Sequence, residues 1–143
     1  MKKLIILIPL LLIGCTLSNT PTSKIEEFLG KYQSLNIEIN TEKLNIDKEN
    51  KKEIEEIIKR QYKNMSYEIK DEEIDGNKSV VTVEIEVYNY KDILNENNNV
   101  IKELKKTKKR ITYTINFELT KEKDIWKINN LKEEDNNKLL GIF

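Results

Sequence analysis

The sequence of 143 residues contains no histidine and only one cysteine. Without histidine, neither a Ser-His-Asp nor a Cys-His catalytic arrangement can be built, and histidine cannot serve as a metal ligand. A single cysteine cannot close a disulfide within the chain, so the fold must depend on its apolar core. The 25 basic and 25 acidic residues cancel, which removes the general electrostatic case for nucleic-acid binding. We therefore expect no nucleic-acid partner, no cofactor and no metal site.

The chain also lacks an apolar run long enough to cross a membrane. The apolar stretch at residues 4–13 follows Lys2 and Lys3, whereas a stable transmembrane helix needs about 20 such residues. A short apolar stretch after a positive start is typical of a targeting segment. It leads into Gly14-Cys15, and together these features resemble the signal of bacterial lipoproteins. The alternatives are a chance cysteine behind an ordinary secretory signal and an uncleaved anchor.

The lipoprotein resemblance implies how Cys15 is processed and where the protein resides. A lipoprotein peptidase would cut between Gly14 and Cys15, and Cys15 would carry a diacylglyceryl thioether as the new first residue. Two or more acyl chains hold a protein firmly, because each buried CH₂ contributes about 0.8 kcal/mol. We therefore expect a protein anchored by lipid on the extracytoplasmic face of the cell membrane, with the lipoprotein processing enzymes among its partners.

This pattern divides the chain into three segments. Residues 1–14 are the expected signal peptide, residues 15–22 the lipidated cysteine and its tether, and residues 23–143 a single folded domain. Domains of this size are large enough for one hydrophobic core. Because the tether is short and polar, the domain is expected to lie close to the membrane surface.

Helical spacing of apolar residues predicts two helices at the start of the domain. Ser23 and Glu26 have the spacing of a capping box. The apolar residues of this first helix are Ile25, Phe28, Leu29 and Tyr32. A second helix is predicted over residues 47–64, and its apolar stripe consists of Ile54, Ile57, Ile58, Tyr62 and Met65. The connection at residues 35–39 fits either a short strand or an irregular segment.

Alternation of apolar and polar residues then predicts strands. Residues 65–69 and 81–87 form the expected hairpin around Asp75-Gly76-Asn77, whose residues readily adopt positive φ. Residues 92–99 are predicted as a loop and residues 100–109 as a short helix. The clearest strand covers residues 111–119, and a turn at residues 121–124 leads to a return strand at residues 125–130. A last helix over residues 132–140 is expected to end at Gly141 in a left-handed cap, with Ile142 making the hydrophobic contact.

Helices followed by antiparallel hairpins define an α+β domain, in which N-terminal helices pack on a curved antiparallel sheet. This order resembles the cystatin-like and nuclear-transport-factor-like superfamily and, more narrowly, small lipoproteins of low-GC Gram-positive bacteria. The resemblance is carried by KIEEFLGKYQSLN, KRQYKNMSYEIKDEEIDG, SVVTVEIEVYNY, KKRITYTINFELTKEKDIWKINNL and EEDNNKLLGIF. These motifs are structural, so the resemblance implies no catalytic residues. It does imply that a homodimer can form through the sheet.

Two groups of residues are candidate binding surfaces. The first is a set of tyrosines that could line a concave sheet or a patch, although such residues more often belong to the core: Tyr88, Tyr90 and Tyr113. The second is a basic run: Lys105, Lys106, Lys108, Lys109 and Arg110. Each such charge near an anionic surface adds about 1 kcal/mol, so the run could contact phospholipid headgroups or anionic wall polymers. Its alternative interpretation is a solvated helix face.

A third pattern imitates the start of a calcium-binding loop. Asp71, Glu73, Asp75 and Gly76 have the right spacing, but Thr82 stands where the loop needs a bidentate acid. Strands are also expected on both sides in place of helices. An acidic hairpin turn is therefore the favoured interpretation.

These observations favour a non-enzymatic, lipid-anchored domain that binds a partner protein or a small apolar ligand at the cell envelope. The alternative is a small-pocket enzyme that uses a buried Asp or Glu with Tyr. No acid is expected on an apolar face, since Glu84 and Glu86 lie on the polar face of their strand. A ligand carrier predicts a cavity lined by Tyr and Ile beneath the first helix. A protein-binding domain predicts a filled core and an exposed apolar or aromatic patch.

Overall fold

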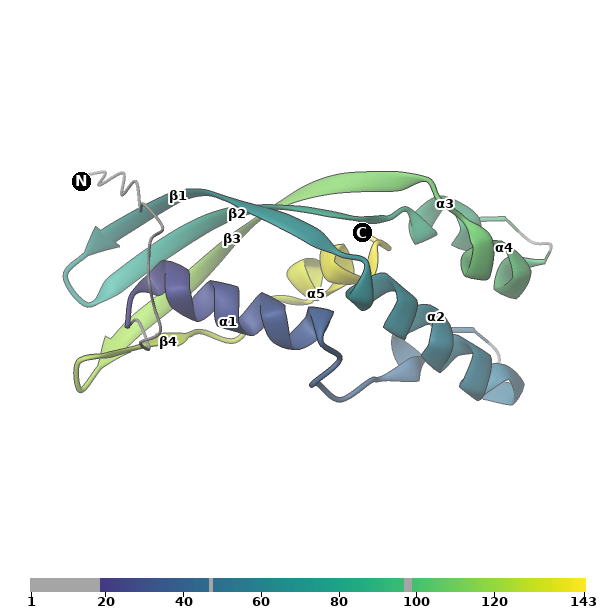
Figure 1. The fold of residues 1–143 in the computed structure, drawn as a ribbon, viewed down its shortest axis with the longest axis horizontal. Coiled ribbons are helices and arrows are strands. Elements are labelled where there is room, and N and C mark those ends of the chain that lie inside the picture. Colours follow the sequence, from purple (N-terminus) through teal and green to yellow (C-terminus); the bar gives the residue numbers. More distant parts are fainter. Residues whose placement is uncertain (1–18, 47, 97–98) are drawn as a thin grey trace.

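The computed structural model describes residues 19–46, 48–96 and 99–143. The expected signal peptide, with Gly14 and Cys15, lies outside the described residues. Within them the chain forms an α+β fold built on an antiparallel sheet of four strands in the order β1-β2-β3-β4. The sheet is open at both edges, and helices pack on its inner face (Figure 1).

Helix α1 spans Pro21–Gln33 and begins three residues earlier than a Ser23 cap would place it, so the predicted capping box of Ser23 and Glu26 is wrong. Thr20 is its N-cap, and the side chains of Thr20 and Ser23 each accept from the other residue's backbone N–H at 3.0 Å. Pro21 suits the first helical position, because its φ is already helical and it has no N–H to satisfy. Residues 21 and 22, expected in the tether, therefore belong to the folded domain.

Helix α2 spans Lys51–Lys63 and follows two short 3-10 turns, η1 at Thr41–Leu44 and η2 at Lys48–Asn50. The expected stripe is confirmed, since Ile54, Ile57, Ile58 and Tyr62 are buried. The expected start of this helix, residue 47, lies outside the described residues. Residues 35–39 form an irregular connection rather than a strand, beginning with Leu35 in a left-handed conformation at φ 62°.

The two predicted hairpins are confirmed, and their strands are longer than expected at most ends. Strands β1 (Ser66–Asp75) and β2 (Lys78–Tyr88) pair around Gly76, which has φ 61°. Strand β3 (Arg110–Glu122) pairs with β2 and with the short strand β4 (Ile125–Ile128). One face of this sheet is apolar and buried, with rows that include Val81, Val83, Ile85, Ile115 and Phe117. The core therefore lies between that face and the helices.

The expected loop over residues 92–99 is wrong in its first part. Helix α3 (Tyr90–Leu94) occupies it, because the Asn89 side chain caps the helix by accepting from the Asp92 N–H at 3.2 Å. Helix α4 (Val100–Lys106) is shorter than predicted. The last helix, α5 (Glu133–Leu140), ends as expected at Gly141 with φ 73°.

The fold is elongated, and its two ends differ (Figure 1). One end carries the start of α1 and the turns of both hairpins, at residues 75–78 and 122–125. We call it the hairpin end. The other end carries α3, α4 and the start of α2, and we call it the helical end.

Candidate functional site

The space between α1 and the sheet is filled by side chains. The Phe28 ring meets Phe117 of β3 edge to face, with centroids 5.8 Å apart. Phe28 also packs on Tyr32, which meets Tyr62 of α2 edge to face at 4.9 Å. Such aromatic pairs add packing energy beyond the area that they bury. Among the described residues, this packing occupies the place beneath α1 where an apolar-ligand cavity was expected.

Two of the three candidate tyrosines belong to the core. Tyr90 is fully buried, and its hydroxyl donates to the Ile57 carbonyl oxygen at 3.1 Å. Burial raises the pKa of Tyr90 to about 12, against the opposing effect of Arg60. Tyr113 is also buried and donates to the Phe143 carbonyl oxygen at 2.9 Å, and burial raises its pKa as well. Both hydroxyls therefore stay neutral and bind the backbone.

The third tyrosine, Tyr88, has the guanidinium groups of both arginines of the chain over its ring. The Arg60 guanidinium lies 4.0 Å from the centre of the Tyr88 ring, and that of Arg110 lies 5.0 Å from it. Tyr90 packs nearly parallel to Tyr88 with centroids 6.1 Å apart. We call Arg60, Tyr88 and Arg110 the arginine–tyrosine stack. It joins α2, the end of β2 and the start of β3, and sequence reasoning missed Arg60 as a member.

The donors of both arginines are used inside the molecule. Arg60 donates to the carbonyl oxygens of Leu104 and Thr107 at 3.1 and 2.6 Å, which fixes the end of α4. Arg110 donates to the Glu86 carboxylate at 2.7 Å and to the Glu86 carbonyl oxygen at 3.1 Å. A planar guanidinium suits such paired acceptors better than an ammonium does. The stack therefore fixes the helical end and presents little free charge to a ligand.

The backbone of Tyr88 is held by a fully buried amide, Gln61. The Gln61 Nε2 donates to the carbonyl oxygens of Tyr88 and Leu140 at 2.9 and 2.8 Å, and its Oε1 accepts from the Tyr88 N–H at 2.7 Å. Gly141 lies against the same place, where a methyl group would overlap the Tyr88 carbonyl oxygen. Elements α2, β2 and α5 thus meet at Tyr88 without spare room.

The predicted basic run is largely neutralised by neighbouring acids. Its ion pairs are Lys105–Glu53 at 3.4 Å, Lys106–Glu103 at 3.6 Å, Lys109–Asp92 at 3.3 Å and Arg110–Glu86 at 2.7 Å. Exposed pairs of this kind stabilise a fold little, but they cancel the local field. Lys108 is exposed. The run therefore gives weak support to contact with an anionic surface.

The expectation that no acid lies on an apolar face is wrong. Glu72 of β1 is 4% exposed, and its Oε1 accepts from both the N–H and the hydroxyl of Thr22 at 2.9 Å. A carboxylate is favoured beside the first turn of a helix, where backbone N–H groups have no helical partner. The other oxygen, Oε2, is buried and has no hydrogen-bond partner among the residues that the structure describes. Glu72 therefore holds the start of α1 on β1.

A bulge in β1 explains why alternation missed Glu72. The register with β2 shifts between Ile69 and Asp71. Before the shift, Tyr67 and Ile69 lie on the inner rows; after it, Glu72 and Ile74 do. One extra residue exchanges the two faces of a strand.

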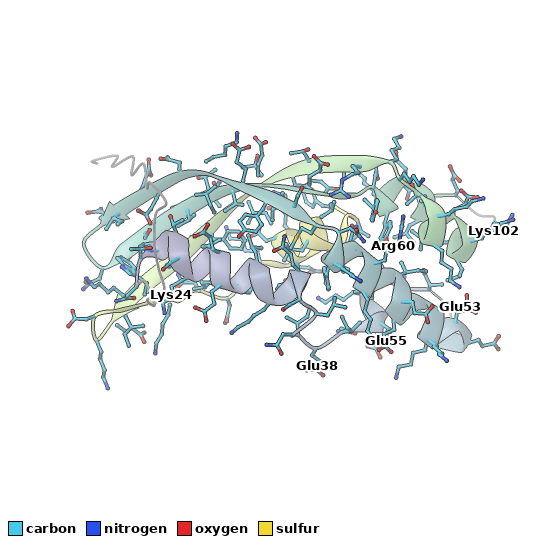
Figure 2. The ribbon with its side chains drawn as sticks, viewed as in Figure 1. Lys24, Glu38, Glu53, Glu55, Arg60 and Lys102 are labelled. Atoms are coloured by element: carbon cyan, nitrogen blue, oxygen red, sulfur yellow. The ribbon has the colours of Figure 1, made fainter. Side chains whose placement is uncertain are left out.

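A shallow groove of about 240 Å³ separates α1 from β4. Its α1 wall is a single stripe with helical spacing: Lys24, Glu27, Phe28 and Lys31. Its other wall is the short strand: Trp126, Lys127 and Ile128. We call these residues the α1–β4 groove. Figure 2 places Lys24 at the hairpin end. Trp126 is 6% exposed and Phe28 is half-buried, so aromatic rings form the floor and lysines the rim.

Asn19 covers the first part of the free edge of β4. Its Oδ1 accepts from the Trp126 N–H at 3.1 Å, and its Nδ2 donates to the Asp124 carbonyl oxygen. The side-chain amide thus bonds to β4 as a neighbouring strand would. Sequence reasoning missed Asn19, because it placed this residue in the tether.

Two further hollows are open to solvent. One of about 530 Å³ lies between α2 and α4 and is crossed by the Lys105–Glu53 ion pair; Figure 2 labels Glu53 and Lys102 on its walls. The other, of about 170 Å³, lies on the polar outer face of the sheet and includes Glu84 and Glu86. Neither combines an apolar floor with a free backbone edge.

Within residues 19–46, 48–96 and 99–143, no group of three or more acidic or cysteine side chains is placed to bind a metal ion. In the same ranges, no helix has the length and apolar character needed to span a membrane. Comparison of the chain with protein-family models, with curated proteins and with solved structures found no match.

Proposed function

We propose that this protein is a non-enzymatic binding domain of cystatin-like architecture, anchored by lipid on Cys15 to the extracytoplasmic face of a bacterial cell membrane, and that its ligand is a partner protein. The anchor is supported by Gly14-Cys15 after a short apolar stretch. The architecture is supported by helices that cover one face of a twisted antiparallel sheet (Figure 1).

One observation favours a partner protein over a small apolar ligand. The interior beneath α1 is filled by the Phe28, Tyr32 and Phe117 rings, whereas the α1–β4 groove is open and floored by aromatic side chains. Sites for small molecules are usually concave and occupy about 300–1,000 Å³. The α1–β4 groove is smaller than that and shallow, and the larger hollow between α2 and α4 is open to solvent and crossed by the Lys105–Glu53 ion pair. A narrow, partly apolar groove beside an edge strand suits a polypeptide segment.

The small-pocket enzyme remains the second candidate in principle, because Glu72 is the buried acid that it requires. One Glu72 oxygen is bound by Thr22, however, and no tyrosine hydroxyl bonds to it. Its position against the start of α1 suits a structural role. We therefore prefer the binding function.

The anchor is tested with the full chain expressed in a Gram-positive host. Cys15→Ala is expected to remain unprocessed and to lose all labelling by a fatty-acid probe, because the thioether cannot form. The measurement is gel mobility together with probe incorporation. Normal labelling of Cys15→Ala would refute the anchor.

Partner binding is tested by photo-crosslinking in intact cells. A photoreactive residue replaces either Lys31, in the groove, or Lys59, a lysine on α2 with a side chain 44% exposed against 53% for Lys31, which is likewise paired with a glutamate four residues earlier. We expect a discrete protein adduct from position 31 and none from position 59. A bound small molecule in native mass spectra, without any adduct, would favour a ligand carrier instead.

A further inference from the structure

We propose that the α1–β4 groove binds an extended, acidic segment of the partner, which adds to the free edge of β4 as a further strand. This inference rests on the proposed binding function and names the chemistry of the partner. It follows from three features of the groove: the direction of the β4 backbone groups, the stripe on α1 and the surrounding charge.

The backbone of β4 offers hydrogen-bonding groups on the side away from β3. In an antiparallel ladder, residues alternate between pairs that exchange hydrogen bonds and pairs whose N–H and C=O groups point outward. The Trp126 N–H bonds to Asn19, so the Trp126–Lys121 pair is of the outward kind. Two residues on, the Ile128–Leu119 pair must be outward as well. The Trp126 carbonyl and the Ile128 N–H and carbonyl therefore point away from β3, and none of the described residues bonds to them.

The opposite wall gives such a strand something to pack against. Strand addition obtains its affinity from main-chain hydrogen bonds and its specificity from pockets for alternate side chains. Here one set of alternate side chains would lie on the Phe28 and Trp126 rings. The α1 stripe runs along the groove for two helical turns, from Lys24 to Lys31. An extended segment fits this space, whereas a helix is about 10 Å wide.

The charge around the groove selects an acidic segment. Lys24 makes no ion pair with any described residue, while Lys31 is 4.0 Å from Glu27 and Lys127 is 3.3 Å from Glu122. The Lys121 ammonium lies 5.7 Å from the centre of the Trp126 ring. The groove lining itself holds three lysines and a single acid, Glu27. A segment that alternates acidic and apolar residues would place its apolar side chains on the floor and its carboxylates near the rim.

The opposite edge of the sheet is a poor competitor for the same segment. Strand β1 carries a bulge between Ile69 and Asp71, and bulges discourage pairing at an edge. Its exposed residues include Glu68 and Asp75, so it would repel an acidic strand. The two edges therefore differ in both geometry and sign of charge.

The test uses Trp126 as an intrinsic reporter, because it is the only tryptophan of the chain. The full chain in detergent micelles is titrated with an end-blocked hexapeptide of alternating glutamate and valine. We expect a saturable change in Trp126 fluorescence and at least tenfold slower hydrogen exchange of the Ile128 amide. The same peptide with alternate backbone nitrogens methylated is expected not to bind, because it cannot pair with β4. A lysine–valine peptide is expected to bind at least tenfold more weakly.

A matched pair of double variants locates the site. Lys24→Glu with Lys31→Glu changes two lysines seven positions apart on α1, and Lys52→Glu with Lys59→Glu changes two with the same spacing on α2. The α1 variant is expected to lower the affinity for the acidic peptide at least tenfold. The α2 variant is expected to leave that affinity unchanged. If the α1 variant loses helicity, strand pairing is judged in the unaltered chain instead. The two measurements are binding of the methylated peptide and hydrogen exchange of the Ile128 amide.

Several results would overturn the inference. The acidic peptide could fail to bind, or the methylated peptide could bind as tightly as the unmodified one. Both double variants could lose the same affinity for the acidic peptide. Trp126 fluorescence could also change with protein concentration alone, which would identify a second copy of the chain as the occupant of the groove. These outcomes are distinct from failure of the proposed function. A crosslinked partner at position 31 with no strand pairing would leave the binding function standing and remove only the mode of binding.

Discussion

At the helical end of the molecule the Arg60 guanidinium lies 4.0 Å from the centre of the Tyr88 ring, and at the hairpin end the Lys121 ammonium lies 5.7 Å from that of Trp126. Both ends thus pair cations with aromatic rings. At the helical end, the N–H groups of Arg60 donate to backbone carbonyl oxygens. At the hairpin end, the lysines lie around an open groove beside the outer edge of β4. A cation next to an aromatic ring therefore does not mark a binding site unless donors and space remain.

The choice of side chain follows the same division. The chain has 25 basic residues and only two arginines, and both lie in the stack. A guanidinium can stack on a ring while it donates to several fixed acceptors, whereas an ammonium is a mobile, strongly hydrated point charge. Both arginines thus join structural elements to one another, whereas lysines line the α1–β4 groove.

The largest expected effect comes from Gly141→Ala, at the cap of α5 beside Tyr88. The new methyl group would overlap the Tyr88 carbonyl oxygen, and the backbone has φ 73°. Displacing Tyr88 would also disturb its bonds to Gln61. We expect a loss of roughly 3–5 kcal/mol in the free energy of unfolding, measured by denaturant titration.

Gly76→Ala at the hairpin end is the control for that variant. Gly76 has a similar φ of 61° but open space around the site of the methyl group. Only the conformational cost remains, about 1–2 kcal/mol. Equal losses in the two variants would mean that the packing at Tyr88 is looser than described.

The second prediction concerns alkaline pH. Burial raises the pKa of Tyr90 from 10.0 to about 12, so the folded state keeps the proton that the unfolded state releases. This contribution is fully present below pH 10 and is lost as the pH rises from 10 to 12. The expected loss is about 3 kcal/mol, since each unit of pKa corresponds to about 1.4 kcal/mol. Unfolding free energy measured across this range should fall less steeply in Tyr90→Phe; an identical slope would contradict the buried, neutral phenol.

The smallest expected effect compares the two cations. Arg60→Lys removes the fork that reaches both Leu104 and Thr107, and we expect it to cost about 1–2 kcal/mol. Lys121→Arg at the hairpin end changes a cation without fixed acceptors and is expected to stay within about 0.5 kcal/mol. Thermal unfolding measures both. Affinity for the acidic peptide at Trp126 should be unaffected by Arg60→Lys. A change in that affinity would mean that the two ends of the molecule do not act independently.

Most regular elements could be predicted from the sequence, because periods of two and 3.6 residues are local properties. The β1–β2 turn at Gly76 and the left-handed cap at Gly141 followed from residue type alone. The start of α1 was missed because Thr20 and Pro21 precede the first apolar residue of the stripe. Helix α3 was missed because it has only five residues and runs into the polar segment at residues 92–99 that was predicted as a loop.

The candidate site was less predictable, because it depends on residues brought together by the fold. The tyrosine set named Tyr88, but the partner that stacks most closely on it, Arg60, comes from another element. The groove combines an α1 stripe with a strand about 100 positions later, which no local pattern connects. Glu72 shows the remaining limit: the predicted strand ended at residue 69, and strict alternation cannot anticipate the bulge that turns Glu72 inward.

In the proposed mode of binding, Asn19 limits the number of main-chain hydrogen bonds open to a partner strand, because it covers the first part of the β4 edge. Beyond it, only Trp126 and Ile128 have outward backbone groups, and each main-chain hydrogen bond contributes about 0.5–1.5 kcal/mol net. So few contacts give fast dissociation, since affinity within one interface is governed mostly by the off-rate. Occupancy of the groove would then follow the local abundance of the partner from moment to moment, which suits a protein that senses its surroundings better than one that holds a permanent complex.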